Sequence, residues 1–346
     1  MTRFARALAV MAGLAMTSGP ASADTTYSIL EYEELRGWEH DDHDAALKVF
    51  LNTCADMKDP DWSSLCALAT NQKKARTFFE LFFRPVLIED GDPMLFTGYF
   101  EPELNGSRTR SSKFRYPLYR KPPEVRNGQT WFSRAQIEEQ NLLAGRGLEI
   151  AWIDDPVDVF FLHIQGSGRV RLQDGGMLRV GYGGKNGHNY RSVGQELVRR
   201  GIYNVHQVSA QVIRNWVKRN PVEGAQLLRH NPSYVFFREV TEVPATRGPL
   251  GAMNRSITTL RSIAVDPKYV PLGAPVWIEK AGRDPLRRLM IAQDTGSAIK
   301  GAQRADIFYG TGDEAGRAAG RVRDPGRMVV LMPIQSAYAL APGDTG

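Results

Sequence analysis

The feature that most constrains the fold of this chain is a change of hydrophobic pattern near residue 90. Before this point apolar residues recur at helical spacing, whereas from Leu95 they gather in short runs separated by glycine and proline. The 33 glycines and 20 prolines favour many short strands and turns over a helical bundle. The pattern therefore predicts a mainly β protein with flanking helices.

The order of the segments predicts how this β protein is organised. A helix-containing middle interrupts the strands, and one economical arrangement inserts it into a barrel built from both flanks. Helices are expected over Ala45–Leu51, Ser63–Phe83, Ser192–Arg200, Ser209–Lys218 and Val222–Arg229. Strands are expected at Leu95–Phe100, at Val157–Ile164, and from Tyr234 to Met332, and the tail after Pro333 is expected to be irregular.

The N-terminus has the pattern of a secretory signal peptide. Arg3 and Arg6 precede a short apolar run from Ala7 to Met16, and Ala21-Ser-Ala23 fits a cleavage site. The alternative is a buried N-terminal helix. We expect export to the periplasm and removal of residues 1–23. No cysteine lies near the cleavage point, so we expect a protein that is soluble or peripherally associated with the outer membrane, without a lipid anchor.

The charge balance excludes some classes of partner. Removing residues 1–23 lowers the Lys and Arg count from 44 to 42 against 38 acids, so the net charge becomes +4. This mild basicity suits an anionic polymer or envelope surface. It lacks the concentrated basic footprint of a nucleic-acid-binding protein, so no nucleic-acid partner is expected.

Two further groups have structural interpretations. Cys54 and Cys66 are the only cysteines, and in an oxidising compartment they are candidates for a disulfide, with two buried thiols as the alternative. His40 and His43, close to Asp41 and Asp42, could be metal ligands. Helix capping explains acids at a helix start more simply, so no metal is expected.

Three aspartates form the most informative cluster. Asp294 and Asp306 lie twelve residues apart, and Asp266 lies upstream in Val265-Asp266-Pro267. Glycine, proline and short apolar runs surround all three, so turns would bring the carboxylates to strand ends. Acids held together in a poorly solvated cleft cannot all stay ionised, which keeps a proton available at neutral pH. Alternatively, Asp306 caps a turn or pairs with Arg304.

Asp294-Thr-Gly-Ser also matches the short signature of aspartic proteases. That chemistry requires two such loops sharing a proton. The other Asp-Thr-Gly begins at Asp344, at the C-terminus. The protease interpretation is therefore disfavoured.

Two motifs have the composition of a sugar site. Thr97-Gly-Tyr99 joins a hydroxyl to an aromatic ring, and Gln165-Gly-Ser167-Gly offers hydrogen bonds beside flexible backbone. Sugar rings need flat apolar faces and many polar partners. Core packing of Tyr99 and an ordinary hairpin turn at Ser167 are the competing interpretations.

In combination, these motifs resemble one known family. Phe96-Thr-Gly-Tyr-Phe-Glu-Pro102, His163-Ile-Gln-Gly-Ser-Gly-Arg169, Arg179-Val-Gly-Tyr182, Asn231-Pro-Ser-Tyr234, Gly248-Pro-Leu-Gly251 and the three aspartates occur in this order. Together they are similar to the membrane-bound lytic murein transglycosylase A family with its three-aspartate ("3D") domain. The resemblance spans roughly residues 90–333.

The resemblance implies a double-psi β-barrel with a smaller inserted β-rich domain and a glycan-binding groove between them. We expect the barrel to comprise residues 24–103 and 235–346, and the insert residues 104–234. The family cleaves peptidoglycan between N-acetylmuramic acid and N-acetylglucosamine without water, forming 1,6-anhydro ends. Peptidoglycan strands, with possible cell-wall enzyme partners, are then the expected partners, and the protein is expected to be a monomer without a cofactor.

The resemblance also assigns roles to individual residues. Asp306 matches the catalytic acid, which then acts as base, and Asp294 is expected to support it and to raise its pKa. The substrate-binding set is expected to be Thr97, Tyr99, Gln165, Ser167, Asp266 and Lys300. Within this set Asp266 precedes Pro267 and organises a turn, and Lys300 either bonds to substrate or neutralises Asp294. A noncatalytic peptidoglycan-binding module remains the alternative.

Overall fold

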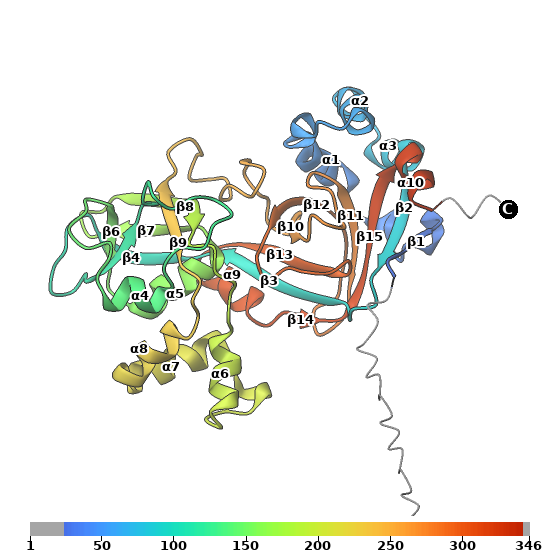
Figure 1. The fold of residues 1–346 in the computed structure, drawn as a ribbon. Helices are drawn as coiled ribbons and strands as arrows, with labels where there is room; N and C mark the ends of the chain where they lie inside the picture. Colours follow the sequence, from blue (N-terminus) through green and yellow to red (C-terminus); the bar gives the residue numbers. More distant parts are fainter. Residues whose placement is uncertain (1–23, 342–346) are drawn as a thin grey trace, which may run out of the picture.

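Two β-sheets, each with its own helices, make up the protein (Figure 1). The computed structural model describes residues 24–341, so the predicted signal peptide lies outside the described residues. Within 24–341 none of the helices has the length and apolar character that a membrane span requires. The predicted mainly β architecture with flanking helices is confirmed.

The larger sheet is built from both flanks of the chain. Its strands are β1 (Thr26–Ile29), β2 (Phe83–Glu89), β3 (Leu95–Glu101), β10 (Ser262–Val265), β11 (Pro275–Lys280), β12 (Leu286–Thr295), β13 (Arg304–Thr311), β14 (Arg323–Asp324) and β15 (Gly326–Pro333). Their order across the sheet is β1-β2-β15-β11-β12-β10-β13-β3-β14, and the sheet curls into a nearly closed barrel.

The centre of this sheet has a symmetric arrangement. β10 and β13 are antiparallel, whereas β12 runs parallel to β10 and β3 runs parallel to β13. Each central strand is thus paired with a parallel partner on its outer side, which fits the predicted double-psi barrel. The two parallel pairs bring Asp294 and Asp306 toward the same end of the barrel.

The smaller sheet belongs to the inserted segment. In the order β5-β6-β4-β7-β8-β9 it contains β5 (Tyr116–Tyr119), β6 (Glu149–Ile153), β4 (Glu103–Ser107), β7 (Gly168–Leu172), β8 (Met177–Lys185) and β9 (Val235–Glu239). We expected the second barrel segment to begin at residue 235. Strand β9 instead pairs antiparallel with β8 and belongs to the smaller sheet. We propose residues 103–239 as the inserted domain.

The helices of the insert include one correction. Val157–Ile164, predicted as a strand, lies in helix α5 (Pro156–Gln165). The Asp155 side chain accepts a hydrogen bond from Val157 N (2.7 Å), and Pro156 occupies the first turn, a helix start signal that outweighs the apolar run. The other helices of the insert are α4 (Arg134–Glu139), α6 (Val193–Arg199), α7 (Ala210–Arg219) and α8 (Pro221–Arg229). The last three confirm the predicted helices.

Helices also cover the barrel. These are α1 (His43–Leu51), α2 (Pro60–Ala69), α3 (Ala75–Phe82), α9 (Gly312–Ala319) and α10 (Ile334–Leu340), with short 3-10 turns at Tyr32–Glu34, Trp38–His40 and Cys54–Asp56; a further such turn, Val205–Gln207, lies in the insert. α10 replaces the irregular tail expected after Pro333. Asp42 caps α1 by accepting from Ala45 N (3.0 Å), as the capping interpretation predicted.

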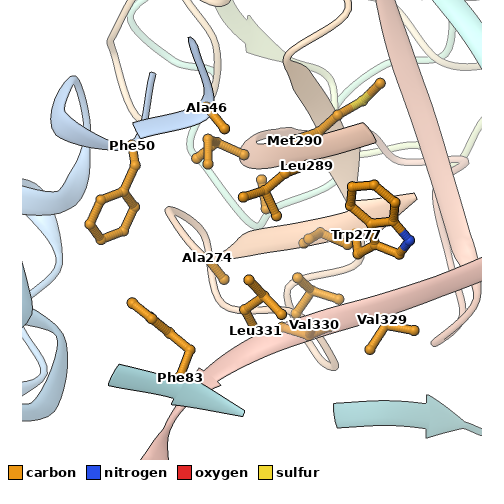
Figure 2. Close-up of a cluster of buried hydrophobic side chains, with 14 of the residues drawn as sticks. Ala46, Phe50, Phe83, Ala274, Trp277, Leu289, Met290, Val329, Val330 and Leu331 are labelled. Atoms are coloured by element: carbon orange, nitrogen blue, oxygen red, sulfur yellow. The ribbon is translucent and has the colours of Figure 1, made fainter. Parts of the chain in front are cut away.

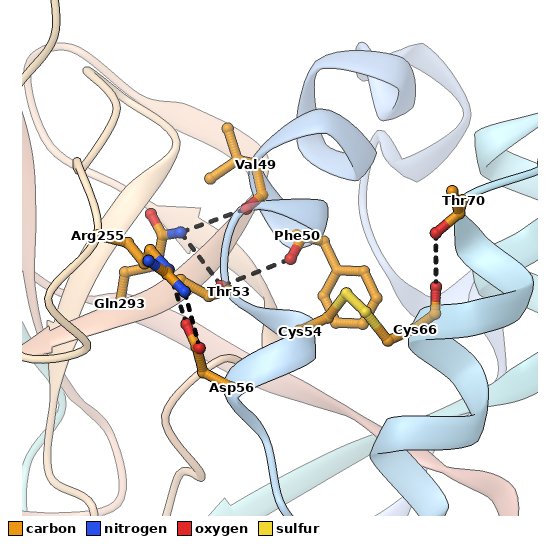
Figure 3. The surroundings of a disulfide bond; sticks show 9 residues. All are labelled: Val49, Phe50, Thr53, Cys54, Asp56, Cys66, Thr70, Arg255 and Gln293. Carbon is orange, nitrogen blue, oxygen red and sulfur yellow. Dashed lines mark hydrogen bonds and ion pairs between the residues drawn. A yellow bond between two sulfur atoms is a disulfide. The ribbon is translucent and has the colours of Figure 1, made fainter.

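The Cys54–Cys66 disulfide is formed, and it joins α2 to the turn after α1 (Figure 3). The Thr53 hydroxyl in that turn and the Val49 carbonyl of α1 accept hydrogen bonds from the buried Gln293 side chain of β12. The disulfide thus closes a short loop, and the end of this loop at Cys54 is fixed to the barrel through Gln293.

The main hydrophobic core lies between the barrel strands and α1–α3. Figure 2 shows Phe50 of α1 and Phe83 of β2 near Trp277, Leu289 and Leu331 from the barrel strands. All five side chains are fully buried. Because this core fixes β11, β12 and β15, it also holds the strand that carries Asp294.

Candidate active site

Four residues form a row across four neighbouring strands. Ala264 of β10 pairs with Asp294 of β12 on one side and with Asp306 of β13 on the other, and Asp306 in turn pairs with Thr97 of β3. Paired residues on adjacent strands point to the same face, so both carboxyl groups and the Thr97 hydroxyl share one face. The register of β10 and β12 shifts at Ala264, which places a bulge beside the acids.

Asp306 is held by one oxygen only. The Thr97 hydroxyl donates to Asp306 Oδ1 (2.7 Å), and Thr97 Oγ1 itself accepts from the Arg304 guanidinium (2.8 Å). Arg304 can only donate, so the direction of both hydrogen bonds is fixed. Within the described chain no donor reaches Oδ2, which leaves this oxygen available to a ligand.

Asp294 is held by both oxygens. Its Oδ2 accepts from the Tyr99 hydroxyl (2.9 Å), and its Oδ1 accepts from the backbone N–H groups of Ala252 (3.0 Å) and Thr295 (2.9 Å). Tyr99 also packs its ring on Phe308, 5.3 Å between centroids. Tyr99 is thus a core residue that also donates a hydrogen bond to Asp294, as the core-packing interpretation predicted in part; its contact with glycan stays a prediction.

Burial raises the pKa of both acids. Burial raises the pKa of Asp294 to about 6, against the hydrogen bonds from Thr295, Tyr99 and Ala252. Burial also raises the pKa of Asp306, against the Thr97 hydroxyl and the Arg304 charge. A small cluster of buried hydrophobic side chains, which includes Ala264 of the row itself, contributes to this burial; its members are Tyr99, Ile257, Ala264, Ile299 and Phe308.

The charges of the two acids act on each other. The charge of Asp306 contributes to the raised pKa of Asp294. Because repulsion between two carboxylates is reciprocal, this agrees with the expectation that the charge of Asp294 raises the pKa of Asp306. For Asp306 the largest cause is burial, and the Thr97 hydroxyl and the Arg304 charge act in the opposite direction.

Asp266 has a different role from the other two aspartates. It is buried beyond the end of β10, where its side chain accepts from Lys268 N (3.2 Å) and Gly301 N (3.1 Å). Lys300 Nζ lies 3.5 Å from Asp266 Oδ1, so its ion pair is with Asp266 and not with Asp294. Asp266 thus organises the turn, as its position before Pro267 predicted.

A groove of about 690 Å³ runs past the acids between the two domains. The barrel contributes Tyr99, Asp306 and the segment 294–300, which runs from Asp294 to Lys300. The insert contributes Gln165, Ser167 and Tyr182. Thr97 and Asp266 do not line this groove. The structure therefore brings Tyr99, Gln165, Ser167 and Lys300 to the groove and places Thr97 behind Asp306.

Gln165 and Ser167 sit where α5 ends. Gly166 ends the helix in the left-handed conformation (φ 77°), and the Gln165 side chain accepts from Phe100 N of β3 (3.1 Å). A Cβ atom at Gly168 would lie 2.5 Å from Leu162 Cδ1 and 3.1 Å from the Pro102 carbonyl oxygen, so a side chain there would force its neighbours to shift. The two glycines thus let the insert approach the barrel strand at this point.

Two contributors to the site escaped the sequence analysis. The Ala252 N–H comes from a loop after β9 with no strong local pattern, and Ala264 matters through its register between the acids. For Ala264, the only available sequence signal was a small residue in a strand that could lie between the strands of Asp294 and Asp306. In residues 24–341 no group of three or more His, Cys, Asp or Glu side chains is arranged to hold a metal ion.

A nearly closed barrel with two half-buried acids, facing an inserted domain across a groove, defines a class of protein equipped for acid–base chemistry on an extended ligand. Comparison with known proteins identifies the family. Residues 95–238 match the MltA specific insert domain, and residues 261–332 match the 3D domain.

Named relatives agree with these matches. The membrane-bound lytic murein transglycosylase A of Vibrio cholerae is 34% identical over 264 residues, covering 72% of this chain and 69% of the relative. The Escherichia coli K12 protein of that name is 37% identical over 246 residues, covering 68% and 65%. The chain belongs to the membrane-bound lytic murein transglycosylase A family.

Solved structures show the same fold. The membrane-bound lytic murein transglycosylase from Agrobacterium tumefaciens superimposes with a TM-score of 0.81 at 32% identity, covering 91% of this chain and 99% of that one. The E. coli MltA with bound chitohexaose gives a TM-score of 0.72 at 29% identity, covering 89% and 94%.

Proposed function

We propose that this protein is a peptidoglycan lytic transglycosylase that cleaves glycan strands without water, using Asp306 as acid and then as base. The observation that carries this proposal is the row Asp294, Ala264 and Asp306, which line the interdomain groove, with Thr97 paired to Asp306 behind it. The E. coli relative binds chitohexaose, which supports a glycan strand as the ligand of this protein too.

In the first step protonated Asp306 donates its proton from Oδ2 to the glycosidic oxygen. The bond from this oxygen to C1 of N-acetylmuramic acid breaks, and N-acetylglucosamine leaves with a free hydroxyl while positive charge develops at C1. Among residues 24–341 no donor binds Oδ2, so this oxygen can reach a ligand. Glycan that covers the groove removes water from Asp306 and raises its pKa further.

In the second step the C6 hydroxyl of the same muramic acid attacks C1. Its oxygen forms the new C–O bond, and its proton passes to the Asp306 carboxylate, which restores the acid. The product is a 1,6-anhydro ring. The nucleophile comes from the substrate, so a second catalytic carboxylate that activates water, as in ordinary glycosidases, is not required.

Asp294 supports the transition state in this scheme. With a pKa of about 6 it is mostly ionised at neutral pH, and its negative charge stabilises the positive charge at C1. Its three donors fix the carboxylate in place. Gln165, Ser167 and Lys300 bind glycan from the groove walls, and the exposed ring of Tyr182 offers a flat face for a sugar.

The test is digestion of purified sacculi, followed by mass spectrometry of the soluble muropeptides. Wild type is expected to release fragments with anhydro ends, and Asp306→Asn is expected to release almost none. Reducing ends would show a hydrolase and overturn the non-hydrolytic mechanism. Sacculus binding without any released fragments would favour the noncatalytic binding module instead.

A further inference from the structure

Three charged residues in the sequence motifs have no part in the chemistry above. Glu101 ends the Thr97-Gly-Tyr99 strand, Arg169 follows the Gln165-Gly-Ser167 turn, and Arg179 begins the next motif along the chain. They come from β3, β7 and β8, that is, from both sheets. In the structure they meet at one buried point where the insert joins the barrel.

Glu101 is the centre of this cluster. Its side chain is fully buried, and its Oε2 accepts from Arg169 Nε (3.0 Å), from an Arg179 guanidinium nitrogen (3.2 Å) and from the Thr311 hydroxyl (2.8 Å). Its Oε1 lies 2.9 Å from Arg179 Nε. Thr311 ends β13, the strand of Asp306. One carboxylate therefore connects two strands of the barrel with two strands of the insert.

The same two guanidinium groups also hold the loop that follows β9. Arg169 donates to the Ala245 carbonyl (2.9 Å), and Arg179 donates to the carbonyls of Pro244 (3.3 Å) and Arg247 (2.7 Å). Backbone carbonyls in an irregular loop need such partners, because no strand or helix satisfies them. The loop then runs directly to Ala252, whose N–H donates to Asp294.

Stability alone is a weak reason to bury such a cluster. A buried carboxylate between two guanidinium groups loses its hydration, and apolar residues of similar size often stabilise a protein as well or better. What the cluster supplies is fixed geometry, since bidentate and forked guanidinium contacts allow few alternative arrangements.

We propose that Glu101 is a positioning residue that, through Arg169 and Arg179, fixes the loop of residues 240–252 and so delivers the Ala252 N–H to Asp294 across the domain junction. This inference rests on the proposed function for its effect on catalysis. Its structural part, the fixed loop, can be measured without any activity.

The first measurement compares the pH dependence of kcat/KM in wild type and Glu101→Gln. The Ala252 hydrogen bond lowers the pKa of Asp294, so a loosened loop is expected to raise that pKa. Tyr99 and Asp306, the titratable groups that face Asp294, are expected to keep their positions. The rising acid limb of the profile should move to higher pH, with kcat/KM at pH 6 falling about tenfold.

Glu103→Gln is the matched control. Glu103 lies two residues further along, is half-buried, and contacts Arg169 (3.9 Å) and Arg171 (3.4 Å) without reaching Arg179 or the loop. Its profile is expected to match wild type. An unshifted profile in Glu101→Gln, or the same shift in both variants, would overturn the proposal.

The second measurement is amide hydrogen exchange over residues 240–257. Glu101→Gln is expected to exchange faster there than wild type and Glu103→Gln, with the barrel core unchanged. Equal protection in all three proteins would reject the fixed loop even if the enzyme is active. Wild type could release no glycan fragments while the loop in Glu101→Gln exchanges faster than in wild type. In that case the proposed function fails and the loop inference stands.

Milder variants cover the case in which Glu101→Gln does not fold. Thr311→Val removes one hydrogen bond to Glu101 and keeps all three charges, and Arg179→Lys keeps the charge but loses the forked donors. Both are expected to show the same shift and the same faster exchange, to a smaller extent in Thr311→Val. Wild-type behaviour in Arg179→Lys would contradict the proposal.

Discussion

The two walls of the groove are built differently. On the barrel wall Asp306 and Asp294 project from the two strands that flank β10 in one sheet, and side chains or backbone of adjacent elements bind their oxygens. On the insert wall Gln165 is the last residue of α5, and Ser167 lies in the turn after it. The barrel wall combines fixed geometry with burial that raises both pKa values, whereas Gln165 and Ser167 offer neutral polar groups on the insert wall.

This difference indicates how catalysis and recognition are separated. A proton donor must have a defined position and a raised pKa, and strands buried on an apolar cluster provide both. Sugar hydroxyls tolerate more variation in their partners. Variants of the barrel wall should therefore change kcat and the pH profile, and variants of the insert wall should mainly change KM.

The largest effect is expected for Asp306→Asn. Loss of the only proposed proton donor should lower kcat by about 10³-fold, with little change in KM. The rate of anhydro-muropeptide release from sacculi measures it. Asp294→Asn serves as comparison and should lose less; a greater loss there than in Asp306→Asn would move the acid to Asp294.

Thr97→Val should have the next largest effect. It removes a hydrogen bond to a carboxylate, a contribution of about 1.5–3 kcal/mol, so kcat should fall about 10- to 100-fold. The Thr97 hydroxyl lowers the pKa of Asp306, so its loss raises that pKa. Because the protonated acid is the active form, the falling alkaline limb of the pH–rate profile should move to higher pH. A limb that stays in place would show that Thr97 does not tune Asp306.

Gln165→Ala tests the insert wall. Loss of a neutral hydrogen-bonding group should raise KM about three- to tenfold, with kcat and the pH profile close to wild type. Initial rates on soluble glycan strands separate the two constants. A shifted pH profile would break the separation between the walls, because Gln165 also binds Phe100 N on the barrel strand.

The smallest effect on activity is expected for Cys54→Ala combined with Cys66→Ala. A disulfide that closes a loop of 12 residues contributes about 3 kcal/mol to the free energy of unfolding, so the melting temperature should fall. Thermal unfolding of wild type and the double variant measures this. Activity well below the melting temperature should be retained, because the Asp56–Arg255 ion pair beside the disulfide remains (Figure 3).

Some of these features could be predicted because they depend on nearby residues. The helices over Ala210–Arg219 and Pro221–Arg229 and the strand at Leu95–Glu101 followed from periodicity and flanking residues. α5 was missed because its apolar run resembles a buried strand, although Asp155-Pro156 carried a helix start signal. The Ala252 contact could not be predicted, since residues 252 and 294 meet only after the strands pair.

The sequence by itself determined the mainly β architecture, the three candidate aspartates and the disulfide pair, because periodicity, residue type and cysteine count are local or compositional properties. The tertiary structure decided that the aspartates are unequal. Register places Asp294 and Asp306 on either side of Ala264, whereas Asp266 ends in a turn with Lys300. It also decided which groups tune each acid, because burial and hydrogen bonding depend on residues up to about 200 positions away in the chain, such as Thr97 on Asp306.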